Sequence, residues 1–246
     1  MSEQTDRVWQ SAEVAHGYLE GMRGAIPLAA EQLDVMMRVI RAAQPELKTF
    51  LDIGCGDGIL GHTLLAHYPD AQGVLLDFSE PMLEAARHKL VASRMQIQFL
   101  NKDYGQADWT KTITILTPFD AIVSGFSIHH QPDVRKKELY SEIFNLLKPG
   151  GIFINIEHIS PDNHWNEELF SELFIDSLVA HNQRHQPDIG SEETERRFRE
   201  REDQYANILA PLDLQLDWMR EIGYQQVSCY LKIFELAVFG GIRPDA

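Results

Sequence analysis

The chain has 246 residues, of which 44% are hydrophobic and 24% are charged, and its formal net charge is −15. This length and composition predict one α/β domain over residues 1–246, with the make-up of an ordinary globular protein. A strongly acidic surface repels phosphate backbones and anionic lipids, which argues against nucleic acid or a membrane as the main partner.

The two cysteines, Cys55 and Cys229, form neither a CxxC pair nor a disulfide framework. The first ten residues are polar, and we find no apolar run that approaches the roughly 18 residues needed to span a membrane. We therefore expect a cytoplasmic protein with reduced thiols.

The first third of the chain predicts helices followed by a strand. Apolar residues in 8–43 recur at three- and four-residue spacings, which predicts two helices, the second beginning near Pro27. We expect residues 1–45 to form a helical cap. Strands and helices then alternate, with strands predicted over 49–54, 73–78, 97–103, 119–127 and 152–158 and helices over 59–68, 79–93 and 133–151. Ser79 is suited to cap the second of these helices. Such alternation predicts a mostly parallel sheet with helices on both faces.

Residues 160–210 interrupt the alternation with two predicted helices, a helical insert after strand five that can act as a lid over a ligand cleft. Several aromatic residues in or near this insert can line such a pocket or pack against the core: Trp165, Phe170, Phe174, Tyr205 and Trp218. A helix over 212–224 follows, with a stop at Gly223, and residues 226–241 predict two strands joined near Leu231.

The segment LDIGCGDG, residues 51–58, places three glycines between a predicted strand and a predicted helix. Such a turn lets a ligand approach the main chain and the helix N-terminus. The Gly-Lys-Ser/Thr run of a P-loop is missing, and Ile59 occupies the third required position of a dinucleotide fingerprint. Asp52, just before the turn, would repel a pyrophosphate and attract a cation, so a ligand with an ammonium or sulfonium group is favoured.

Two further predicted strands end in acidic residues. Asp77 is positioned to accept hydrogen bonds from both hydroxyls of a ribose. Asp103 can accept from an exocyclic amine, and its neighbour Tyr104 can stack on a base. Together these features predict a nucleoside with a cationic tail as ligand.

Five segments in this order resemble the class I methyltransferases that use S-adenosylmethionine: LDIGCGDG, LLDFSEPMLEAAR, NKDYGQADW, FDAIVSGFSIHHQPD and LLKPGGIFIN. The resemblance covers residues 49–158, and the C-terminal hairpin ending in FGG is similar to the last two strands of that family. It implies a Rossmann-like, seven-stranded, mostly parallel sheet whose last strand is antiparallel. The implied cofactor is S-adenosylmethionine, with S-adenosylhomocysteine as product.

The resemblance also implies roles for individual residues. Gly54, Cys55 and Gly56 would lie against the methionine part of the cofactor. The adenosine would be held by Asp77, Phe78, Met82, Asp103 and Tyr104, and Ser124 would approach the amino end. Asp52 either accepts from the ammonium or only orients the turn, and Arg23 either pairs with the cofactor carboxylate or lies on the surface.

Methyl transfer from a sulfonium is an in-line displacement that positioning and a dry site can accelerate. A base is needed only when the acceptor atom must lose a proton. The candidates are His129, His130 and His158, near the predicted ends of strands four and five, with Glu157 beside His158. A purely structural role is the alternative for each.

The absence of a (D/N)PP(Y/F) motif argues against methylation of base or amide nitrogens, and no second carboxylate follows strand four to suggest a Mg²⁺ site. His181 and His185 stand four apart but have no evident third ligand. We therefore expect a metal-independent methyltransferase that acts on a small molecule, and a homodimer is left open.

Three alternatives remain. The insert and the C-terminal segment also resemble the tRNA-wobble-modification enzyme that forms carboxy-S-adenosylmethionine, a reaction that needs an extra cation such as Arg199 or Arg201. A non-catalytic protein that binds S-adenosylmethionine is the second. An NAD-dependent oxidoreductase is disfavoured by Ile59 and Asp52.

Overall fold

The computed structural model describes residues 5–93, 96–113 and 116–245. Within them, seven strands form one sheet in the order β3-β2-β1-β4-β5-β7-β6. β1 to β5 are parallel, while β7 pairs antiparallel with both β5 and β6, which confirms the predicted Rossmann-like sheet with an antiparallel last strand. The strands are β1 (Thr49–Ile53), β2 (Gln72–Asp77), β3 (Ile97–Asn101), β4 (Phe119–Gly125), β5 (Leu147–His158), β6 (Gln225–Ile233) and β7 (Leu236–Ile242).

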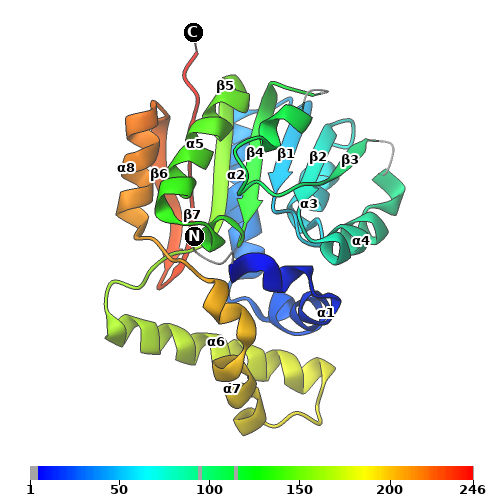
Figure 1. Ribbon diagram of the computed structural model, residues 1–246, viewed down its shortest axis with the longest axis vertical. Helices are drawn as coiled ribbons and strands as arrows, with labels where there is room; N and C mark the ends of the chain where they lie inside the picture. Colours follow the sequence, from blue (N-terminus) through cyan, green and yellow to red (C-terminus); the bar gives the residue numbers. More distant parts are fainter. Residues whose placement is uncertain (1–4, 94–95, 114–115, 246) are drawn as a thin grey trace.

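Helices cover both faces of the sheet. α5 and α8 pack on one face, and α2, α3 and α4 pack on the other (Figure 1). The α-helices are α1 (Ala12–Glu20), α2 (Ala29–Ala43), α3 (Ile59–His67), α4 (Glu80–Lys89), α5 (Asp133–Leu146), α6 (His164–His185), α7 (Ser191–Glu200) and α8 (Leu212–Ile222). Short 3-10 helices are η1 (Thr5–Gln10), η2 (Met22–Ala25), η3 (Val91–Ser93), η4 (Trp109–Thr112), η5 (Ile128–His130) and η6 (Glu202–Ala206).

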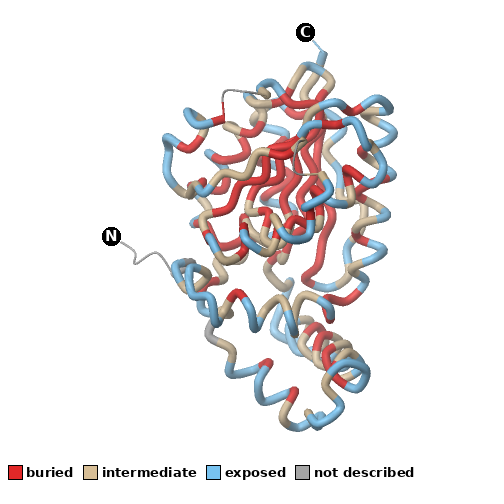
Figure 2. The backbone as a smooth tube through the Cα atoms, turned by 90° about the vertical axis from the view of Figure 1, so that its right-hand side faces the viewer, coloured by how far each residue is buried: buried red, intermediate tan, exposed pale blue. Residues whose placement is uncertain are grey.

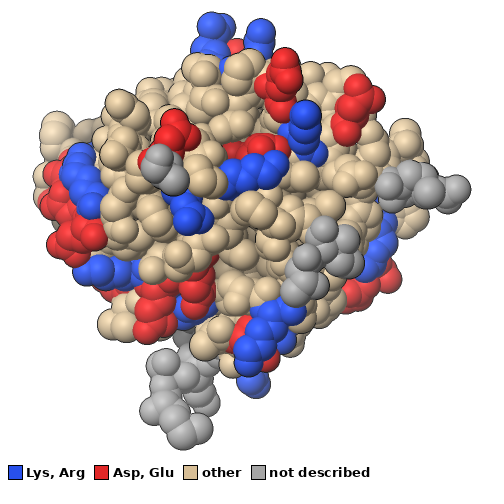
Figure 3. All heavy atoms as spheres, turned by 90° about the horizontal axis from the view of Figure 1, so that it is seen from above, with Lys and Arg blue, Asp and Glu red and all other residues tan. Residues whose placement is uncertain are grey.

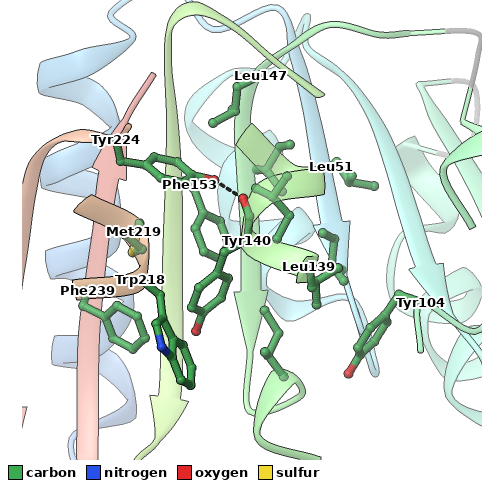
Figure 4. Packing of buried hydrophobic residues seen from close by; sticks show 14 of the residues in the cluster. Leu51, Tyr104, Leu139, Tyr140, Leu147, Phe153, Trp218, Met219, Tyr224 and Phe239 are labelled. Carbon is green, nitrogen blue, oxygen red and sulfur yellow. Dashed lines mark hydrogen bonds between the residues drawn. The ribbon is translucent and has the colours of Figure 1, made fainter. Parts of the chain in front are cut away.

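The strand sequences divide their side chains between the two faces with a period of two, as β geometry requires. In β1, Leu51 and Ile53 enter the cluster under α5 and α8, while Phe50 enters the cluster under α2 and α3. The central strands are buried along most of their length (Figure 2). In the α5/α8 cluster the hydroxyl of Tyr224 donates to the carbonyl of Tyr140 at 2.9 Å (Figure 4). Because helices cover both faces of the sheet, the sequences of the central strands are continuous runs of apolar residues.

Three predicted boundaries were wrong. α2 begins at Ala29 rather than near Pro27, because Leu28 takes a left-handed conformation with φ of +55° before the first helical residue. α5 ends at Leu146, and Leu147 already pairs with Phe119, so residues 147–151 belong to β5 rather than to the helix. The last hairpin turns at residues 234–235 rather than near 231, and Phe234 has a φ of +48° there.

Two sets of helices cover the end of the sheet where the parallel strands finish (Figure 1). We call η1, α1 and η2 the cap, and we call α6, α7 and η6, together with the residues that join them, the lid. The cap packs on the lid: the Ser177 hydroxyl donates to the carbonyl of Ala25 at 2.7 Å, and a side chain at Gly24 would overlap His181. Within the described ranges, no helix combines the length and the apolar character required to cross a bilayer.

Candidate active site

A cavity lies between the strand ends, the cap and the lid. Its floor comes from the loops after β1, β2, β4 and β5, which is where ligands bind in open α/β sheets. Its other walls come from cap residues such as Trp9, Tyr18 and Arg23, and from lid residues such as Phe170 and Arg201. The predicted cofactor residues that line it are Arg23, Asp52, Gly54, Cys55, Gly56, Asp77, Phe78 and Met82.

The three glycines of the turn after β1 all have left-handed backbones, but each for its own reason. A side chain at Gly54, with φ of +62°, would overlap the Ser127 hydroxyl. Gly58 precedes α3 with φ of +76°, and a side chain there would lie 3.0 Å from Leu90. Gly56, with φ of +52°, faces open space within the cavity. Of the three positions, Gly56 is therefore the one at which an added side chain would meet no described protein atom and would compete with a ligand alone.

Asp52 is fully buried at the end of β1. Its Oδ2 accepts from the backbone N–H of Gly61 in α3 at 3.0 Å and so joins the end of β1 to the first turn of that helix. Its Oδ1 has no hydrogen-bond partner within the described residues, and burial raises its pKa to about 7. An unpaired buried carboxylate oxygen on a cavity wall fits a cationic group of a ligand.

Asp77 ends β2 and connects the second loop to the glycine turn. Its Oδ2 accepts from the N–H of Gly56 at 2.9 Å, and its Oδ1 accepts from the N–H of Ser79 at 2.8 Å. Burial raises its pKa to about 6. Each carboxylate oxygen has a second lone pair, so Asp77 can hold the loop and still accept from a ligand hydroxyl. Together, Asp52, Gly56 and Asp77 fit a hydroxylated ligand with a cationic centre.

Arg23 lies in the cavity wall rather than on the open surface. Its Nε is 3.8 Å from Oδ1 of Asp57, and Asp57 also forms an ion pair with Lys89. This contact joins the cap to the glycine turn. Cys55 is buried beside them, and burial raises the pKa of its thiol. The predicted contact of Arg23 with a cofactor carboxylate stays a prediction.

Ser124, Asp103 and Tyr104 are not among the residues that line the cavity. The Ser124 hydroxyl donates to the carbonyl of Ile53 at 2.9 Å and thereby joins β4 to β1. Tyr104 is buried in the cluster under α5 (Figure 4), and its hydroxyl bonds to the Ser127 hydroxyl at 2.7 Å and donates to the Ser127 carbonyl at 2.8 Å. Asp103 accepts from the N–H of Gly105 at 2.7 Å. In this arrangement Ser124 and Tyr104 brace the cavity wall, and the predicted cofactor contacts of all three remain predictions.

The three predicted histidines meet in the cavity. The ring of His129 lies 4.0 Å from that of His130 and 5.8 Å from that of His158. Each ring has one nitrogen held by an acceptor. His129 Nδ1 is 2.5 Å from Oε1 of Glu157, His130 Nδ1 is 3.1 Å from the carbonyl of Ala206, and His158 Nε2 is 2.7 Å from Oε2 of Glu235.

These partners determine which ring nitrogens stay available. A carbonyl only accepts, so Nδ1 of His130 carries the proton and Nε2 holds a lone pair. His129 is held on both sides, by Glu157 and by the Asn207 side chain. Burial lowers the pKa of His129 and His130 well below the usual value and raises that of Glu157 to about 7. The second nitrogens of His130 and His158 have no hydrogen-bond partner within the described residues.

No role is predicted from the sequence for three residues that line the cavity, Trp9, Ser127 and Asn207, or for Glu235, which holds His158. Ser127 lies within the segment FDAIVSGFSIHHQPD, whereas the other three belong to none of the five family segments and reach the site through long-range contacts. Of the aromatic residues considered in the insert region, Phe170 and Phe174 line the cavity, whereas Trp165 and Tyr205 are exposed and Trp218 packs from α8 into the core cluster.

In the described part of the chain, no group of three or more His, Cys, Asp or Glu side chains is arranged to hold a metal ion. His181 and His185 stack on each other with ring centroids 4.3 Å apart.

Comparison with known proteins agrees with this geometry. Residues 50–151 match a model described as a methyltransferase domain. A carboxy-S-adenosyl-L-methionine synthase from Nautilia profundicola is 20% identical over 92% of this chain and 91% of its own length. A trans-aconitate 2-methyltransferase from Acidovorax sp. (strain JS42) is 28% identical over 83% of this chain and 72% of its own length.

Solved structures share the fold. An O-methyltransferase family protein from Burkholderia thailandensis has a TM-score of 0.61 at 17% identity over 87% of this chain, and PigF with SAH has a TM-score of 0.63 at 17% identity over 98%. This chain spans 56% and 63% of the length of those two chains. The matched domain, the sheet order and the glycine turn agree: this chain carries a methyltransferase domain over residues 50–151 and is similar in fold to the class I S-adenosylmethionine-dependent methyltransferases.

Proposed function

We propose that this protein transfers the methyl group of S-adenosylmethionine to a small-molecule acceptor that loses a proton, with His158 as the general base. The observation that carries the proposal is the meeting of two sets of residues in one cavity. The glycine turn with Asp52 and Asp77 lies at one part of its wall, and the histidines lie at another.

The cofactor would be held by residues that the structure brings to the ends of β1 and β2. Gly54 and Gly56 would lie against its methionine part, Asp52 would face its positive charge, and Asp77 would accept from its ribose. Arg23 is close enough to the turn to reach a carboxylate there. S-adenosylmethionine, when bound, supplies a methyl group activated by a positively charged sulfur.

His158 is the best placed base among the three histidines. His129 is held at both ring nitrogens, which suits a residue that positions its neighbours. His130 is neutral and donates to a main-chain carbonyl, which offers no charge to stabilise a protonated ring. His158 donates to the carboxylate of Glu235, so the positive charge it gains on taking a proton would be stabilised. The acceptor's proton would pass to Nδ1 of His158.

A small acceptor is supported by the way the cavity is enclosed. The cap and the lid both contribute aromatic walls, including Trp9, Phe170 and Phe174. On the face seen in Figure 3, basic and acidic side chains are interspersed, so that face offers no extended basic surface for a nucleic acid. The two free cysteines suit a reducing compartment such as the cytoplasm.

The test is a binding measurement followed by a turnover measurement. Calorimetry with S-adenosylhomocysteine tests the cofactor site, and no binding would overturn the proposal. Formation of S-adenosylhomocysteine is then measured over a panel of hydroxylated and amine acceptors. With a productive acceptor, His158→Ala is expected to lose about 100-fold or more in kcat, whereas the exposed His67→Ala should match wild type. Full activity in both His158→Ala and His130→Ala would exclude a histidine base.

One alternative has a specific observation in its favour. The relative matched over nine-tenths of both chains is a carboxy-S-adenosyl-L-methionine synthase, and Arg201 of the lid lines the cavity here. The distinguishing measurement is mass spectrometry of the small molecule released when the purified protein is denatured. A carboxylated S-adenosylmethionine would favour that alternative, and S-adenosylmethionine or its demethylated product would favour methyl transfer. No turnover with any acceptor would favour a non-catalytic binding protein.

A further inference from the structure

The cavity contains hydrogen-bond donors that no described residue satisfies. Among the described residues, only two buried side-chain donors lack a partner: the indole Nε1 of Trp9 and the Nε of Arg201. Both residues line the cavity, Trp9 from the cap and Arg201 from the lid. Of the buried acceptors without partners, Asp52 Oδ1 at the end of β1 belongs to a residue that lines the cavity. The cavity wall therefore has an unpaired acceptor at the end of β1 and unpaired donors on the covering side.

Trp9 is held firmly where it lies. Its carbonyl accepts from the hydroxyl of Ser79 at 2.6 Å, and its ring contacts Tyr18 at 5.2 Å and His130 at 5.7 Å between centroids. His130 in turn bonds to the carbonyl of Ala206 in η6. The indole is thus fixed between the cap, the histidines and η6, so its unpaired N–H results from a constrained position and not from a free side chain.

Arg201 lies between α7 and η6, as the residue just before η6, and has only part of its hydrogen-bonding capacity used. Its Nη1 donates to the carbonyl of Phe198 at 2.6 Å, and its guanidinium stacks 4.1 Å from the centre of the Phe198 ring. Its nearest carboxylate is Asp203, with 3.5 Å between Nε and Oδ2 and no hydrogen bond at Nε. These contacts fix the plane of the guanidinium and leave an N–H edge unpaired.

Arg201 keeps an open hydrogen-bonding position in spite of a nearby carboxylate. Its Nε lies 3.5 Å from Oδ2 of Asp203, closer than the 3.8 Å between Arg23 and Asp57, and burial lowers the pKa of Arg201 and raises that of Asp203. The Nε–H of Arg201 nevertheless has no hydrogen-bond partner among the described residues.

We propose that Arg201 and Trp9 form a subsite for a carboxylate carried by the methyl acceptor, so that the acceptor is an anionic small molecule. The inference rests on the proposed function. A carboxylate matches the planar guanidinium edge of arginine and accepts in addition from a single N–H such as that of the indole. Bound there, the acceptor would span from the lid and cap to the histidines, and its reacting group would lie next to His158 or His130.

The test uses matched pairs of acids and amides with the protein first saturated with S-adenosylhomocysteine. Binding of S-adenosylhomocysteine is measured separately, so a failed cofactor site is recognised independently of a failed subsite. Calorimetry then compares aromatic hydroxy acids with their primary amides, beginning with 4-hydroxybenzoate and 4-hydroxybenzamide. At least tenfold tighter binding of the acids is expected. Equal affinity across the panel, or no binding of any acid, would overturn the proposal.

Single-residue variants test whether the preference for acids over amides depends on Arg201 and Trp9. Arg201→Gln should abolish the preference for acids and Trp9→Phe should weaken it several-fold, while Arg199→Gln, an exposed arginine two positions away, should leave it intact. Arg201→Lys keeps the charge without the planar edge and should give an intermediate preference, which guards against a folding defect in Arg201→Gln. Equal losses in Arg201→Gln and Arg199→Gln would contradict a local subsite. If wild type retains a carboxylated S-adenosylmethionine that Arg201→Gln does not, the carboxylate belongs to the cofactor and the assignment to the acceptor is wrong.

Discussion

His158 Nε2 lies 2.7 Å from Oε2 of Glu235, although 77 positions separate the two residues in the chain. His158 ends β5, and Glu235 immediately precedes β7, which pairs antiparallel with β5. The register places Leu236 opposite His158, so the carboxylate arrives beside the ring through sheet pairing. This pair connects the fold to the chemistry that we propose, because it orients the imidazole and can stabilise its protonated form.

Replacement of the Glu235 carboxylate tests that role. Glu235→Gln keeps a hydrogen-bond acceptor near His158 and removes the charge. We expect kcat to fall about 10- to 100-fold, less than for His158→Ala, because the ring stays oriented while its protonated form loses stabilisation. The dissociation constant of S-adenosylhomocysteine should stay within about twofold. The exposed Glu168→Gln serves as the control, and equal kcat values in the two glutamine variants would contradict the prediction.

The glycine turn offers a matched pair that separates folding from cofactor binding. Gly54→Ala places a side chain onto Ser127, and Gly56→Ala places one into open space. Both pay the cost of a left-handed alanine, about 1–2 kcal/mol. We therefore expect Gly54→Ala to be clearly less stable than Gly56→Ala in thermal unfolding. Gly56→Ala should still lose cofactor affinity by about tenfold or more, because its methyl group points into the cavity. Wild-type affinity in Gly56→Ala would show that no ligand approaches the main chain there.

The raised pKa of Asp52 predicts a pH-dependent cofactor affinity. With a pKa of about 7, the carboxyl is neutral in mild acid and becomes charged as the pH rises. Attraction for the positive charge of S-adenosylmethionine should therefore increase between about pH 6 and pH 8, several-fold by calorimetry. Asp52→Asn should flatten this dependence. A steep rise that persists in Asp52→Asn would assign the effect to another group, such as Asp77.

The raised pKa of Asp52 also makes the folding stability depend on pH, and here a rise in pH is unfavourable. Because the pKa of Asp52 in the folded state exceeds that of the unfolded chain, its contribution favours folding in acid and is lost as the pH rises through about 7. At about pH 8, Asp52→Asn should therefore unfold at a higher temperature than wild type, and the difference should shrink towards pH 5. Identical melting curves at all pH values would contradict the buried, unpaired state of Oδ1.

Replacement of Lys136 should destabilise the fold, whereas replacement of its neighbour Lys137 should not. Its buried ammonium bonds to Oδ1 of Asp133 at 2.7 Å and to the carbonyl of Ile208. It thereby holds the segment that provides the Ala206 carbonyl to His130. Lys136→Met should cost about 1–3 kcal/mol in the free energy of unfolding and also lower kcat. Lys137→Met should do neither, because Lys137 is exposed and pairs only with Glu221 among the contacts described. Similar denaturant midpoints for the two variants would argue against this anchor.

The parts of the site that could be predicted from the sequence are those in which neighbouring residues act together. The alternation of apolar runs and helical periods defines the order of the strands along the chain, and the glycines with Asp52 and Asp77 lie within a few residues of the strand ends they serve. Such short-range features require only local geometry, and the structure places those cavity residues at the ends of β1 and β2. The boundaries at Leu28 and Leu147 escaped prediction because a left-handed residue and a strand pairing set them.

The sequence by itself thus determined the sheet, the glycine turn and the presence of histidines after β4 and β5. The tertiary structure alone decided which groups those histidines meet. Glu235 reaches His158 through antiparallel pairing, while Trp9 and Arg201 reach the cavity because two segments far apart in the chain fold over the same strand ends. Side chains with no local signature acquire their chemistry from burial and from the partners that packing provides. Their unpaired donors and acceptors become visible only when every neighbour is in place.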